Sequence, residues 1–566
     1  MPNAASPPVP DVRVLDARRA TLASLSTELF DLAIIGGGIT GAGVAREAAL
    51  AGMRVALLER DDFASGTSSR SSRLVHGGVR YLEHGHLSLV FESSRERRLL
   101  LTLAPHLVRP LAFTWPVYRG ARVPRWKVRA GLMLYDALAL FRNQRHHESL
   151  SAADVLNVEP ALLQDGLVGG ARYWDAATDD ARLTLASAIA AKEEGAIVAN
   201  HVAVVGGVRT GPRARLSGVR VDDRITGASF DVQALVVVNA TGPWSDATAA
   251  LTGAPSTGSV LGSAGAHIAV PRQRLGNNDA VTIVSPLDGR VMFALPAGAH
   301  AIIGTTENPA RRGPDEIRAT EQDVTYLLRS ANAMFPNARL TMDDVISAWA
   351  GIRPLASARA GEQAANAASR EHAITHRADG LVSVTGGKLT TYRAMAADVL
   401  SHARRELAHA DIDGKRPLQH AVRPSERSAL PGGDFVSREM LLHDVRAVVT
   451  DAAVAERLMI AFGSRWRNVW AYAQHDATFS HRVVEHLPYL LAEIPFAVEQ
   501  EMAMTLADVL IRRTHIAFET RDHGRGAAAR IAPIMATLLG WSAEDTDAQL
   551  TAYAADTARI FSIDAI

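Results

Sequence analysis

The hydrophobic pattern of residues 30–59 predicts a strand, a helix and a second strand. Leu32 to Ile35 form a short apolar run, a glycine turn follows, a helical stretch extends to about Gly52, and a second apolar run covers Val55 to Glu59. Two short apolar runs on either side of a helix are typical of a βαβ unit with buried strands. Further strands are expected at residues 234–239, 267–270, 291–295, 301–304 and 381–385. Because these strands are dispersed along the chain, we expect interleaved domains.

Both ends of the chain follow other patterns. Beyond about Ser425 the strand signals fade and apolar residues recur at helical spacing, as at Met502, Leu506, Val509 and Leu510. This spacing predicts a separate helical domain at the C-terminus. The first 28 residues lack the apolar segment and the small-residue cleavage site of a secretory signal, so we interpret them as a tail. Elsewhere, charges interrupt every apolar stretch before it reaches the ~18 residues that a membrane-spanning helix needs.

Composition narrows the function classes. A chain of 566 residues exceeds one hydrophobic core, so two or three domains are expected. The 60 basic and 60 acidic side chains cancel, which removes any whole-chain electrostatic case for binding nucleic acid. The chain has no cysteine, which excludes disulfides, thiolate-bound iron–sulfur clusters and a cysteinyl flavin bond, and favours the reducing cytosol.

The glycine turn predicts a dinucleotide site. Gly36, Gly38 and Gly41 fit the G-x-G-x-x-G pattern directly after a predicted buried strand and at the start of a helix. In this context the glycines allow a tight turn, a close approach to a pyrophosphate and close packing of helix on strand. Glu59 ends the second strand, where a carboxylate accepts hydrogen bonds from ribose hydroxyls. The pattern alone does not distinguish FAD from NAD.

A longer motif narrows the choice. Residues 68–83 read Ser-Ser-Arg-Ser-Ser-Arg-Leu-Val-His-Gly-Gly-Val-Arg-Tyr-Leu-Glu, and this stretch closely resembles the signature of FAD-dependent glycerol-3-phosphate dehydrogenases of the aerobic, quinone-linked type. Four shorter motifs follow in the family's order, at residues 239–244, 303–306, 351–355 and 386–393. The resemblance is strong over about residues 30–405 and looser in the C-terminal region, where residues 504–510 and 512–514 carry it.

The resemblance implies an α/β fold of the glutathione-reductase and D-amino-acid-oxidase type. It implies an FAD-binding Rossmann-like domain, an α+β substrate domain with an antiparallel sheet over the flavin, and a C-terminal helical cap. We place the tail at residues 1–28 and the FAD-binding domain at 29–110, 171–260 and 350–424. The substrate domain is then expected at residues 111–170 and 261–349, and the cap at 425–566.

The resemblance also implies a set of FAD-binding residues and no metal. The flavin ring is expected between the Ser-rich, His-Gly-Gly segment and the Gly-Gly-Lys turn, whose amides face charge on the reduced ring. The predicted cofactor residues are Gly36, Gly38, Gly41, Glu59, Ser71, Ser72, His76, Gly77, Gly78, Ala240, Thr241, Gly242, Gly386, Gly387, Lys388, Leu389 and Thr390.

The substrate site needs cations for a phosphate dianion and a group that takes the hydroxyl proton. Similarity to the family places Arg80, Tyr81, Arg353, Arg370 and Lys388 around the substrate. It also aligns His267 with a histidine near the substrate hydroxyl, although the family's usual Lys-Gly-Ser-His is Ala-Gly-Ala-His here. His267 or Arg353 assists the proton transfer, and we favour His267 as the base with Arg353 stabilising the developing alkoxide.

A basic and aromatic segment suggests a membrane surface. Residues 115–129 interleave five cations with Trp115, Tyr118 and Trp126, and apolar residues follow. Such a segment suits anionic lipid headgroups, and a solvated basic hairpin is the alternative. The resemblance favours a cytoplasmic enzyme held peripherally on the inner face of the cell membrane.

The expected reaction is oxidation of sn-glycerol 3-phosphate to dihydroxyacetone phosphate by hydride transfer to N5 of FAD, with electrons passed to a membrane quinone. The alternatives are a glycerol-3-phosphate oxidase that uses O₂, an amino-acid-oxidase-like flavoenzyme, and a non-catalytic flavoprotein. The expected partners are glycerol 3-phosphate, quinone and the membrane surface, a homodimer is left open, and no nucleic acid is expected.

Overall fold

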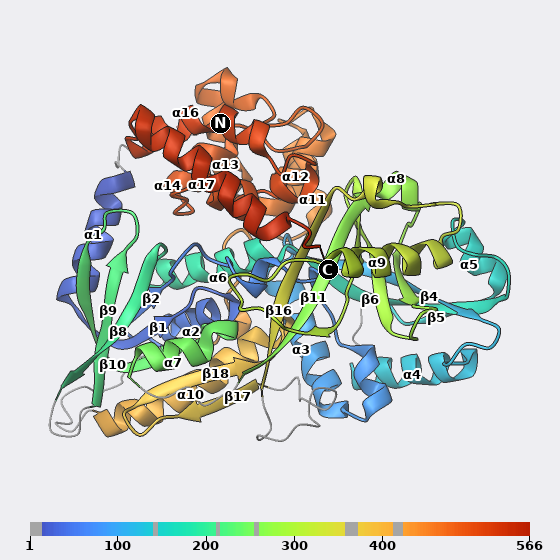
Figure 1. Ribbon diagram of the computed structural model, residues 1–566, viewed down its shortest axis with the longest axis horizontal. Helices are drawn as coiled ribbons and strands as arrows, with labels where there is room; N and C mark the ends of the chain where they lie inside the picture. Colours follow the sequence, from blue (N-terminus) through green and yellow to red (C-terminus); the bar gives the residue numbers. More distant parts are fainter. Residues whose placement is uncertain are drawn as a thin grey trace.

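The computed structural model describes residues 14–139, 145–210, 215–253, 260–356, 372–410 and 423–565. Two β-sheets lie side by side, with a group of helices from the C-terminal part of the chain above them (Figure 1). The first sheet is eight-stranded, and β1 pairs in parallel with β2 and β10, as expected for a βαβ unit. Its strands are β1 (Leu29–Ile35), β2 (Val55–Leu58), β7 (Ile197–Ala199), β8 (Val202–Thr210), β9 (Arg215–Asp223), β10 (Ser229–Asn239), β17 (His372–His376) and β18 (Leu381–Gly386).

Helices and a hairpin cover the two faces of this sheet. The helices α2 (Ile39–Leu50), α6 (Asp180–Glu193) and α10 (Tyr392–Ala410) pack on one face in a single apolar cluster with β1 and β2. The other face meets β8, β9 and α1 (Val14–Thr27). The expected tail is therefore wrong for residues 14–27, because Leu25 is fully buried there and Arg18 pairs with Asp223.

The second sheet has ten strands and is mostly antiparallel. Its long pair β11 and β16 runs in register from Val260 opposite Ala356 to Ala269 opposite Ser347. Helix α9 (Glu321–Met334) packs on one face of this sheet. Its strands are β3 (Leu74–Val75), β4 (Val108–Tyr118), β5 (Glu148–Leu150), β6 (Leu167–Thr178), β11 (Val260–Pro271), β12 (Ala280–Val284), β13 (Val291–Ala297), β14 (His300–Gly304), β15 (Asn308–Pro309) and β16 (Ser347–Ala356).

The predicted domain boundaries remain a prediction. Strands β6 and β16 cross the expected boundaries at residues 170 and 349, and each stays in the second sheet over its whole length. The other helices before the C-terminal part are η1 (Thr67–Ser69), η2 (Val79–His84), α3 (Leu87–Leu103), α4 (Arg125–Leu138), α5 (Ala152–Val158), η3 (Gly242–Trp244), α7 (Ser245–Leu251), α8 (Arg272–Leu275), η4 (Met342–Asp344), η5 (Leu389–Thr391) and η6 (Ser425–Arg427).

The C-terminal part is helical, as its spacing predicts. One segment, η9 (Asp508–Arg513), is a π-helix, a form that is frequent at functional sites. Met502 has a positive φ of 60° and lies outside any helix, so the predicted helix begins later than expected. The other helices are α11 (Arg438–Arg446), α12 (Ala452–Phe462), η7 (Gly463–Arg465), α13 (Trp466–His475), η8 (Ala477–Ser480), α14 (Glu493–Glu499), α15 (Ile516–Glu519), α16 (Arg525–Leu539) and α17 (Ala543–Phe561).

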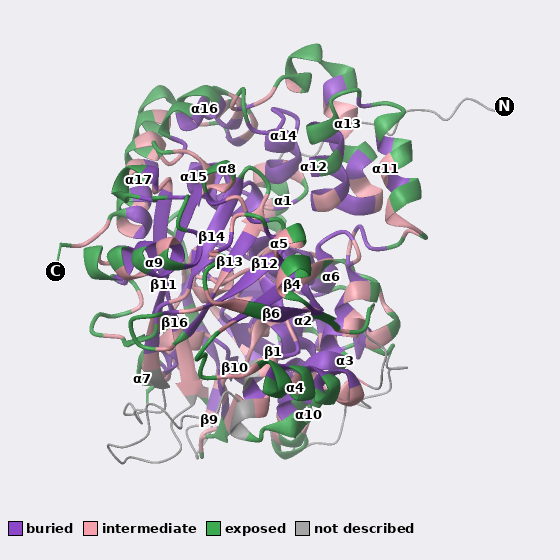
Figure 2. Cartoon of the chain, turned by 90° about the vertical axis from the view of Figure 1, so that its right-hand side faces the viewer, coloured by how far each residue is buried: buried purple, intermediate pink, exposed green. Residues whose placement is uncertain are grey.

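Figure 2 shows that the buried residues follow the strands of both sheets and continue into the C-terminal helices. One apolar cluster joins Phe113 and Trp349 of the second sheet to Phe518 and Phe561 of the C-terminal part. The helical part therefore shares a core with the second sheet. Within the described residues, no helix combines the length and the apolar character needed to cross a membrane.

Candidate active site

A cavity of about 1190 Å³ lies between the two sheets and collects most of the predicted site residues. Its walls come from the ends of β1, β2, β10 and β18 in the first sheet, and from β4, β6, β11, β13 and β16 in the second. A volume of this size exceeds that of an ordinary small-molecule pocket and suits an extended cofactor together with a small substrate. Ligands of α/β folds bind beyond the carboxyl ends of the parallel strands, which is where this cavity begins.

The glycine turn has the shape that a pyrophosphate needs. Gly36 has a φ of 104°, and a Cβ atom there would lie 2.8 Å from the carbonyl oxygen of Ala240. A Cβ atom at Gly41 would lie 1.9 Å from the carbonyl oxygen of Gly36, so only glycine lets α2 pack on the turn. Gly38 is the N-cap residue of α2 and lines the cavity, so the N-terminal end of the helix faces it.

The carboxylate of Glu59 lies beside the glycine turn, just after β2. Its carboxylate accepts hydrogen bonds from the backbone N–H groups of Gly37 (2.6 Å) and Asp61 (2.9 Å). Burial raises the pKa of Glu59, although these two hydrogen bonds oppose the shift. The side chain is buried and lines the cavity after β2, where a ribose-binding carboxylate stands in dinucleotide folds.

The segments predicted to flank the flavin ring are tied to each other. The hydroxyl of Thr390 accepts a hydrogen bond from the backbone N–H of His76 (3.1 Å) and lies 3.3 Å from the carbonyl oxygen of His76, to which it donates. The predicted residues that line the cavity on this side are Ser71, Ser72, His76, Gly78, Ala240, Thr241, Gly242, Gly386, Gly387, Lys388, Leu389 and Thr390. The geometry therefore fits FAD, with the glycine turn for its phosphates and a hydrogen-bonded pair of loops for its ring.

Gly77 lies behind the wall rather than on it. Its N–H donates to Asp175 (3.0 Å), and a Cβ atom there would lie 2.2 Å from the hydroxyl oxygen of Tyr135. Arg97 pairs with the same carboxylate, which also accepts a hydrogen bond from Tyr135 (2.7 Å). The sequence offered no signal for this buried support, because its members come from α3, α4 and β6.

His267 faces the cavity from β11. Its Nε2 atom lies 2.9 Å from the hydroxyl oxygen of Ser72, and its ring stacks on Trp349 at 5.5 Å. The Nδ1 atom has no hydrogen-bond partner among the described residues. Burial, together with the positive charges of Arg353 and Arg73, lowers the pKa of His267 to about 3. The imidazole is therefore neutral at pH 7, which is the form that accepts a proton.

The predicted cations approach the same part of the wall. Arg353 lies on β16, and its Nη2 atom donates to the hydroxyl of Thr305 (3.0 Å). A Cβ atom at Gly265 would lie 2.6 Å from that Nη2 atom, so the Ala-Gly-Ala-His sequence makes room for the guanidinium. Lys388 places its Nζ atom 4.0 Å above the ring of Tyr81. Such a cation–π contact holds the ammonium group at the cavity.

Two predicted substrate residues lie outside this description. Arg370 falls within residues 357–371, and the side chain of Arg80 in η2 is likewise outside the described part of the structure. Their expected contacts with the substrate remain predictions.

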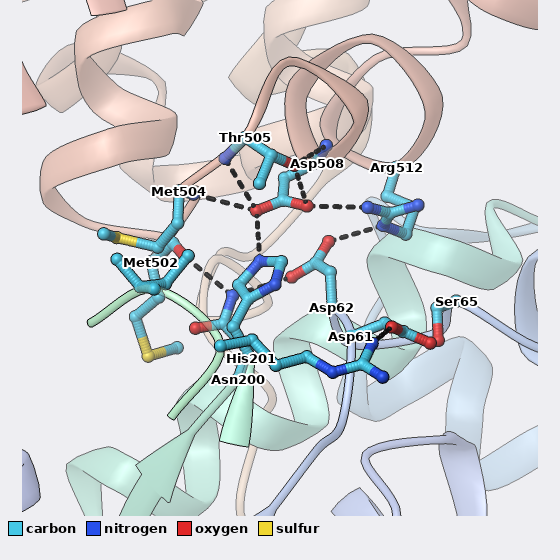
Figure 3. A network of polar contacts seen from close by, with 12 residues as sticks. Asp61, Asp62, Ser65, Asn200, His201, Met502, Met504, Thr505, Asp508 and Arg512 are labelled. Carbon is cyan, nitrogen blue, oxygen red and sulfur yellow. Dashed lines mark hydrogen bonds and ion pairs between the residues drawn. The ribbon is translucent and has the colours of Figure 1, made fainter. Parts of the chain in front are cut away.

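A polar network ties the C-terminal part to the loop that follows Glu59 (Figure 3). The buried carboxylate of Asp62 pairs with Arg512 (2.6 Å) and Arg513 (2.6 Å) of the π-helix. Asp508 of the same helix pairs with Arg512 (2.6 Å) and with the Nε2 atom of His201 (2.8 Å). The positive charges lower the pKa values of both carboxyl groups, overcoming the opposite effect of burial. Sequence reasoning missed this network, which joins residues far apart in the chain.

Comparison with known proteins agrees with this geometry. The FAD dependent oxidoreductase family matches residues 31–393, and the C-terminal domain of alpha-glycerophosphate oxidase matches residues 424–546. Glycerol-3-phosphate dehydrogenase 2 of Mycobacterium tuberculosis is 38% identical over 538 residues, covering 94% of this chain and 88% of the relative. The glycerol-3-phosphate dehydrogenase of Synechocystis sp. is 35% identical over 539 residues, covering 93% of this chain and 95% of the relative.

A solved structure gives the same fold. The glycerol-3-phosphate dehydrogenase from Bacillus halodurans, complexed with FAD, superposes with a TM-score of 0.76 and is 29% identical, covering 97% of this chain and 99% of its own. The predicted fold class and the predicted cofactor, FAD, are thereby confirmed. The chain belongs to the family of FAD-dependent glycerol-3-phosphate dehydrogenases.

Proposed function

We propose that the protein oxidises sn-glycerol 3-phosphate to dihydroxyacetone phosphate and passes the electrons to a membrane quinone. The observation that carries the proposal is the meeting of His267, Arg353 and Lys388 on one cavity with the dinucleotide turn. A neutral base and two cations match a substrate that carries both a secondary alcohol and a phosphate dianion. A site for an amino acid must bind one carboxylate and an uncharged amine. The two cations of this cavity wall fit a phosphate dianion better.

The chain's own residues divide the work. Arg353 and Lys388 bind the negative charge, since a guanidinium or an ammonium group donates charge-assisted hydrogen bonds to phosphate or alkoxide oxygens. FAD, when bound, would supply the two-electron acceptor for the hydride. His267 removes the hydroxyl proton, with Trp349 and Ser72 fixing the orientation of its ring.

The low pKa of His267 is compatible with this role. Arg353 and Arg73 contribute to the shift by repelling a proton from the imidazole. A dianion bound beside Arg353 offsets that charge, so the pKa of His267 rises when substrate arrives. His267 is therefore a stronger base in the substrate complex than in the substrate-free protein.

Anaerobic mixing tests the proposed substrate. Glycerol 3-phosphate should bleach the flavin absorbance within the time of a turnover, and glycerol should do so far more slowly because it has no phosphate to form charge-assisted hydrogen bonds with Arg353 and Lys388. If glycerol and glycerol 3-phosphate bleach the flavin at similar rates, the phosphate is not recognised and the proposed substrate is wrong.

Helix α4 supports the proposed membrane association. Its outward residues include Trp126, Met133 and Leu134, exposed by 70%, 54% and 42%, and these lie among exposed Arg125, Lys127 and Arg129. Exposed apolar side chains between cations are typical of a helix that lies on anionic lipid. Two residues of the predicted surface segment are not free for a membrane: Trp115 is buried, and the half-buried Tyr118 donates a hydrogen bond to the backbone of residue 163.

Vesicle binding tests this surface. The FAD-loaded protein should sediment with vesicles that contain anionic lipid at low ionic strength, and salt should weaken the binding. Replacement of both Trp126 and Met133 by Ser should abolish sedimentation, whereas the same replacement at exposed Val436 and Met440 of the C-terminal part should not. Binding that survives the α4 replacements would place the membrane contact elsewhere.

The oxidase remains the second candidate, because a domain named for alpha-glycerophosphate oxidase matches residues 424–546. The two differ in the acceptor that restores the absorbance of the reduced flavin. After anaerobic bleaching, we expect a soluble quinone to restore it much faster than dissolved oxygen does. The reverse order would replace the dehydrogenase by the oxidase without changing the substrate.

A further inference from the structure

Two histidines of β17 and three residues of α10 face each other at the edge of the first sheet. His372 and His376 are four residues apart on one face of β17, which is an edge strand of the sheet. Asp398, His402 and Glu406 follow at intervals of four along one stripe of α10. Figure 1 shows α10 beside β17 and β18 at the lower edge of the molecule. This β17–α10 cluster lies outside the cavity wall.

The two imidazoles of the cluster meet nitrogen to nitrogen. The Nε2 atom of His376 lies 2.5 Å from the Nδ1 atom of His402, with the ring centroids 4.8 Å apart. The Nδ1 atom of His376 lies 3.0 Å from a carboxylate oxygen of Glu406. The other oxygen of Glu406 accepts a hydrogen bond from Arg215 (2.9 Å).

These contacts determine which nitrogen of His376 carries its proton. Glu406 forms an ion pair with the guanidinium of Arg215. A carboxylate in an ion pair only accepts hydrogen bonds, so the Nδ1 atom of His376 is the donor. In its neutral form, His376 thus presents the lone pair of Nε2 to His402. A carboxylate behind a histidine is the usual outer support of a metal-binding imidazole.

We propose that the β17–α10 cluster binds one divalent transition cation of the zinc class. His376 through Nε2 and His402 through Nδ1 are two ligands. The carboxylate of Asp398, one helical turn before His402, becomes the third by rotating toward them, because in the structure it does not lie within 4.8 Å of both nitrogens. His372 then supports Asp398, to which its Nε2 atom is hydrogen-bonded (3.0 Å), as Glu406 supports His376. Water completes the coordination, because the side chains of His376 and Asp398 are 32% and 61% exposed.

The nitrogen pair must open slightly to admit the cation. Zinc–nitrogen bonds of about 2.0–2.1 Å at a tetrahedral angle separate two nitrogen ligands by roughly 3.3 Å. Since His376 is exposed and His402 is only partly buried, a small rotation of each ring provides this separation. Imidazole and carboxylate ligands together favour zinc, copper or nickel over magnesium or calcium.

A second group of side chains of the kind that bind metals is already paired with arginines. Asp62, His201 and Asp508 also lie close together, but Arg512 and Arg513 already pair with the oxygens of these carboxylates. The buried positive charge of the two guanidinium groups opposes a further cation there. We therefore assign the cation to the β17–α10 cluster alone.

Zinc titration of the full-length, FAD-loaded chain tests the proposal, with any affinity tag removed and the protein treated with chelator beforehand. Calorimetry should show one equivalent of Zn²⁺ bound, and this zinc should raise the melting temperature because it joins β17 to α10. The double variant His376→Gln/His402→Gln should lose this binding. Removal of the outer support in Glu406→Gln should weaken binding by about 10–100-fold.

His409 provides the matched control, because it is exposed on the same helix but outside the cluster. His409→Gln should bind zinc as tightly as the original chain. All variants should keep the same flavin absorbance and, in chelator, the same melting temperature, which separates loss of a ligand from loss of the fold. Equal zinc affinity in the double variant and the original chain would overturn the proposal, as would an original chain that binds no zinc at micromolar concentrations.

Discussion

The two ends of the cavity are built differently. At the glycine turn, backbone groups form the wall, and the buried carboxylate of Glu59 is fixed by the backbone N–H of Gly37. The adjoining loop is held through Asp62 by two arginines of the C-terminal part. At the other end, single long side chains from separate strands and turns, His267, Arg353 and Lys388, reach into the cavity. The first arrangement suits a cofactor that stays bound, because rigid groups lose little entropy on binding. The second suits a substrate that must enter, react and leave.

Replacing His267 should have the largest effect on the reaction. In His267→Gln we expect flavin reduction by glycerol 3-phosphate to slow by about 10²–10⁴, because the proton of the hydroxyl loses its acceptor. FAD content should remain unchanged, since the residue belongs to the substrate end. Rapid mixing under anaerobic conditions measures the rate.

Ser72→Ala controls for a merely structural role of the histidine. It removes the hydrogen bond to Nε2 and leaves the imidazole stacked on Trp349. Its rate should fall far less than that of His267→Gln. Equal loss in the two variants would mean that His267 acts by holding Ser72 rather than by taking a proton.

Breaking the network at Asp62 should weaken FAD binding at the end of the cavity formed by the glycine turn and Glu59. Asp62→Asn leaves Arg512 and Arg513 buried with less compensating charge, and disruption of buried pairs costs about 3–5 kcal/mol of stability. Because Asp62 adjoins the loop of Glu59, FAD should dissociate faster, while the reduction rate of the FAD-loaded fraction stays near normal. Ultrafiltration and flavin fluorescence measure the release.

Asp279→Asn is the matched control for this prediction. It removes the partner of Arg172 (2.7 Å) in the second sheet, away from Glu59. Both variants should melt at lower temperatures, but only Asp62→Asn should release FAD readily. If the control releases FAD equally, retention depends on general stability and not on the C-terminal network.

Loss of one cation should have a moderate effect at the substrate end. Arg353→Met removes charge-assisted hydrogen bonds worth about 1.5–3 kcal/mol each, so kcat/KM for glycerol 3-phosphate should fall by about 10–100-fold. Arg60 is a cation at the opposite end of the same cavity, where it pairs with Asp315. Arg60→Met should leave kcat/KM unchanged at saturating FAD. A similar loss in both variants would mean that total charge, rather than position, attracts the substrate.

The same contrast explains what the sequence can predict. Gly36, Gly41 and Glu59 could be found because strand, turn and helix follow one another locally and each glycine meets a local steric demand. The pairing of Asp62 with Arg512 could not, because 450 residues separate the two and neither lies in a motif whose spacing implies the other. Such long-range pairs depend on how the domains dock, which no local pattern encodes.

Burial of aromatic residues was equally hard to foresee. Trp115 and Trp126 lie in one basic and aromatic segment, yet Trp115 points into the core from β4 and Trp126 is exposed on α4. The segment changes from strand to helix between them, and its composition, which suits a membrane surface or a solvated hairpin, does not show that one tryptophan is buried and the other exposed. His267 and Arg353 entered the prediction through family resemblance, and the pairing of β11 with β16 explains why they approach each other.

The smallest expected effect concerns the pH dependence of stability. Burial lowers the pKa of both His267 and His106 to about 3, from an ordinary value near 6.5. Between these values the unfolded chain binds more protons than the folded one, so each histidine makes stability fall as the pH drops from about 6.5 toward 3. Replacement of either by Gln should therefore flatten the decrease in melting temperature between pH 7 and pH 5.

A bound phosphate should separate the two histidines. Glycerol 2-phosphate carries the dianion but no secondary alcohol, so it should occupy the substrate end without reducing the flavin. Its charge offsets that of Arg353, which raises the pKa of His267 and flattens the pH dependence, while His106, beside α6 and the C-terminal helices, keeps its low pKa. The phosphate itself takes up a proton at about pH 6, which adds a similar slope to all three proteins. Beyond that shared slope, the ligand should flatten the pH dependence in the original chain and in His106→Gln but not in His267→Gln. An equal response in all three proteins would show that the dianion binds away from His267, and the substrate end would have to be sought elsewhere on the cavity wall.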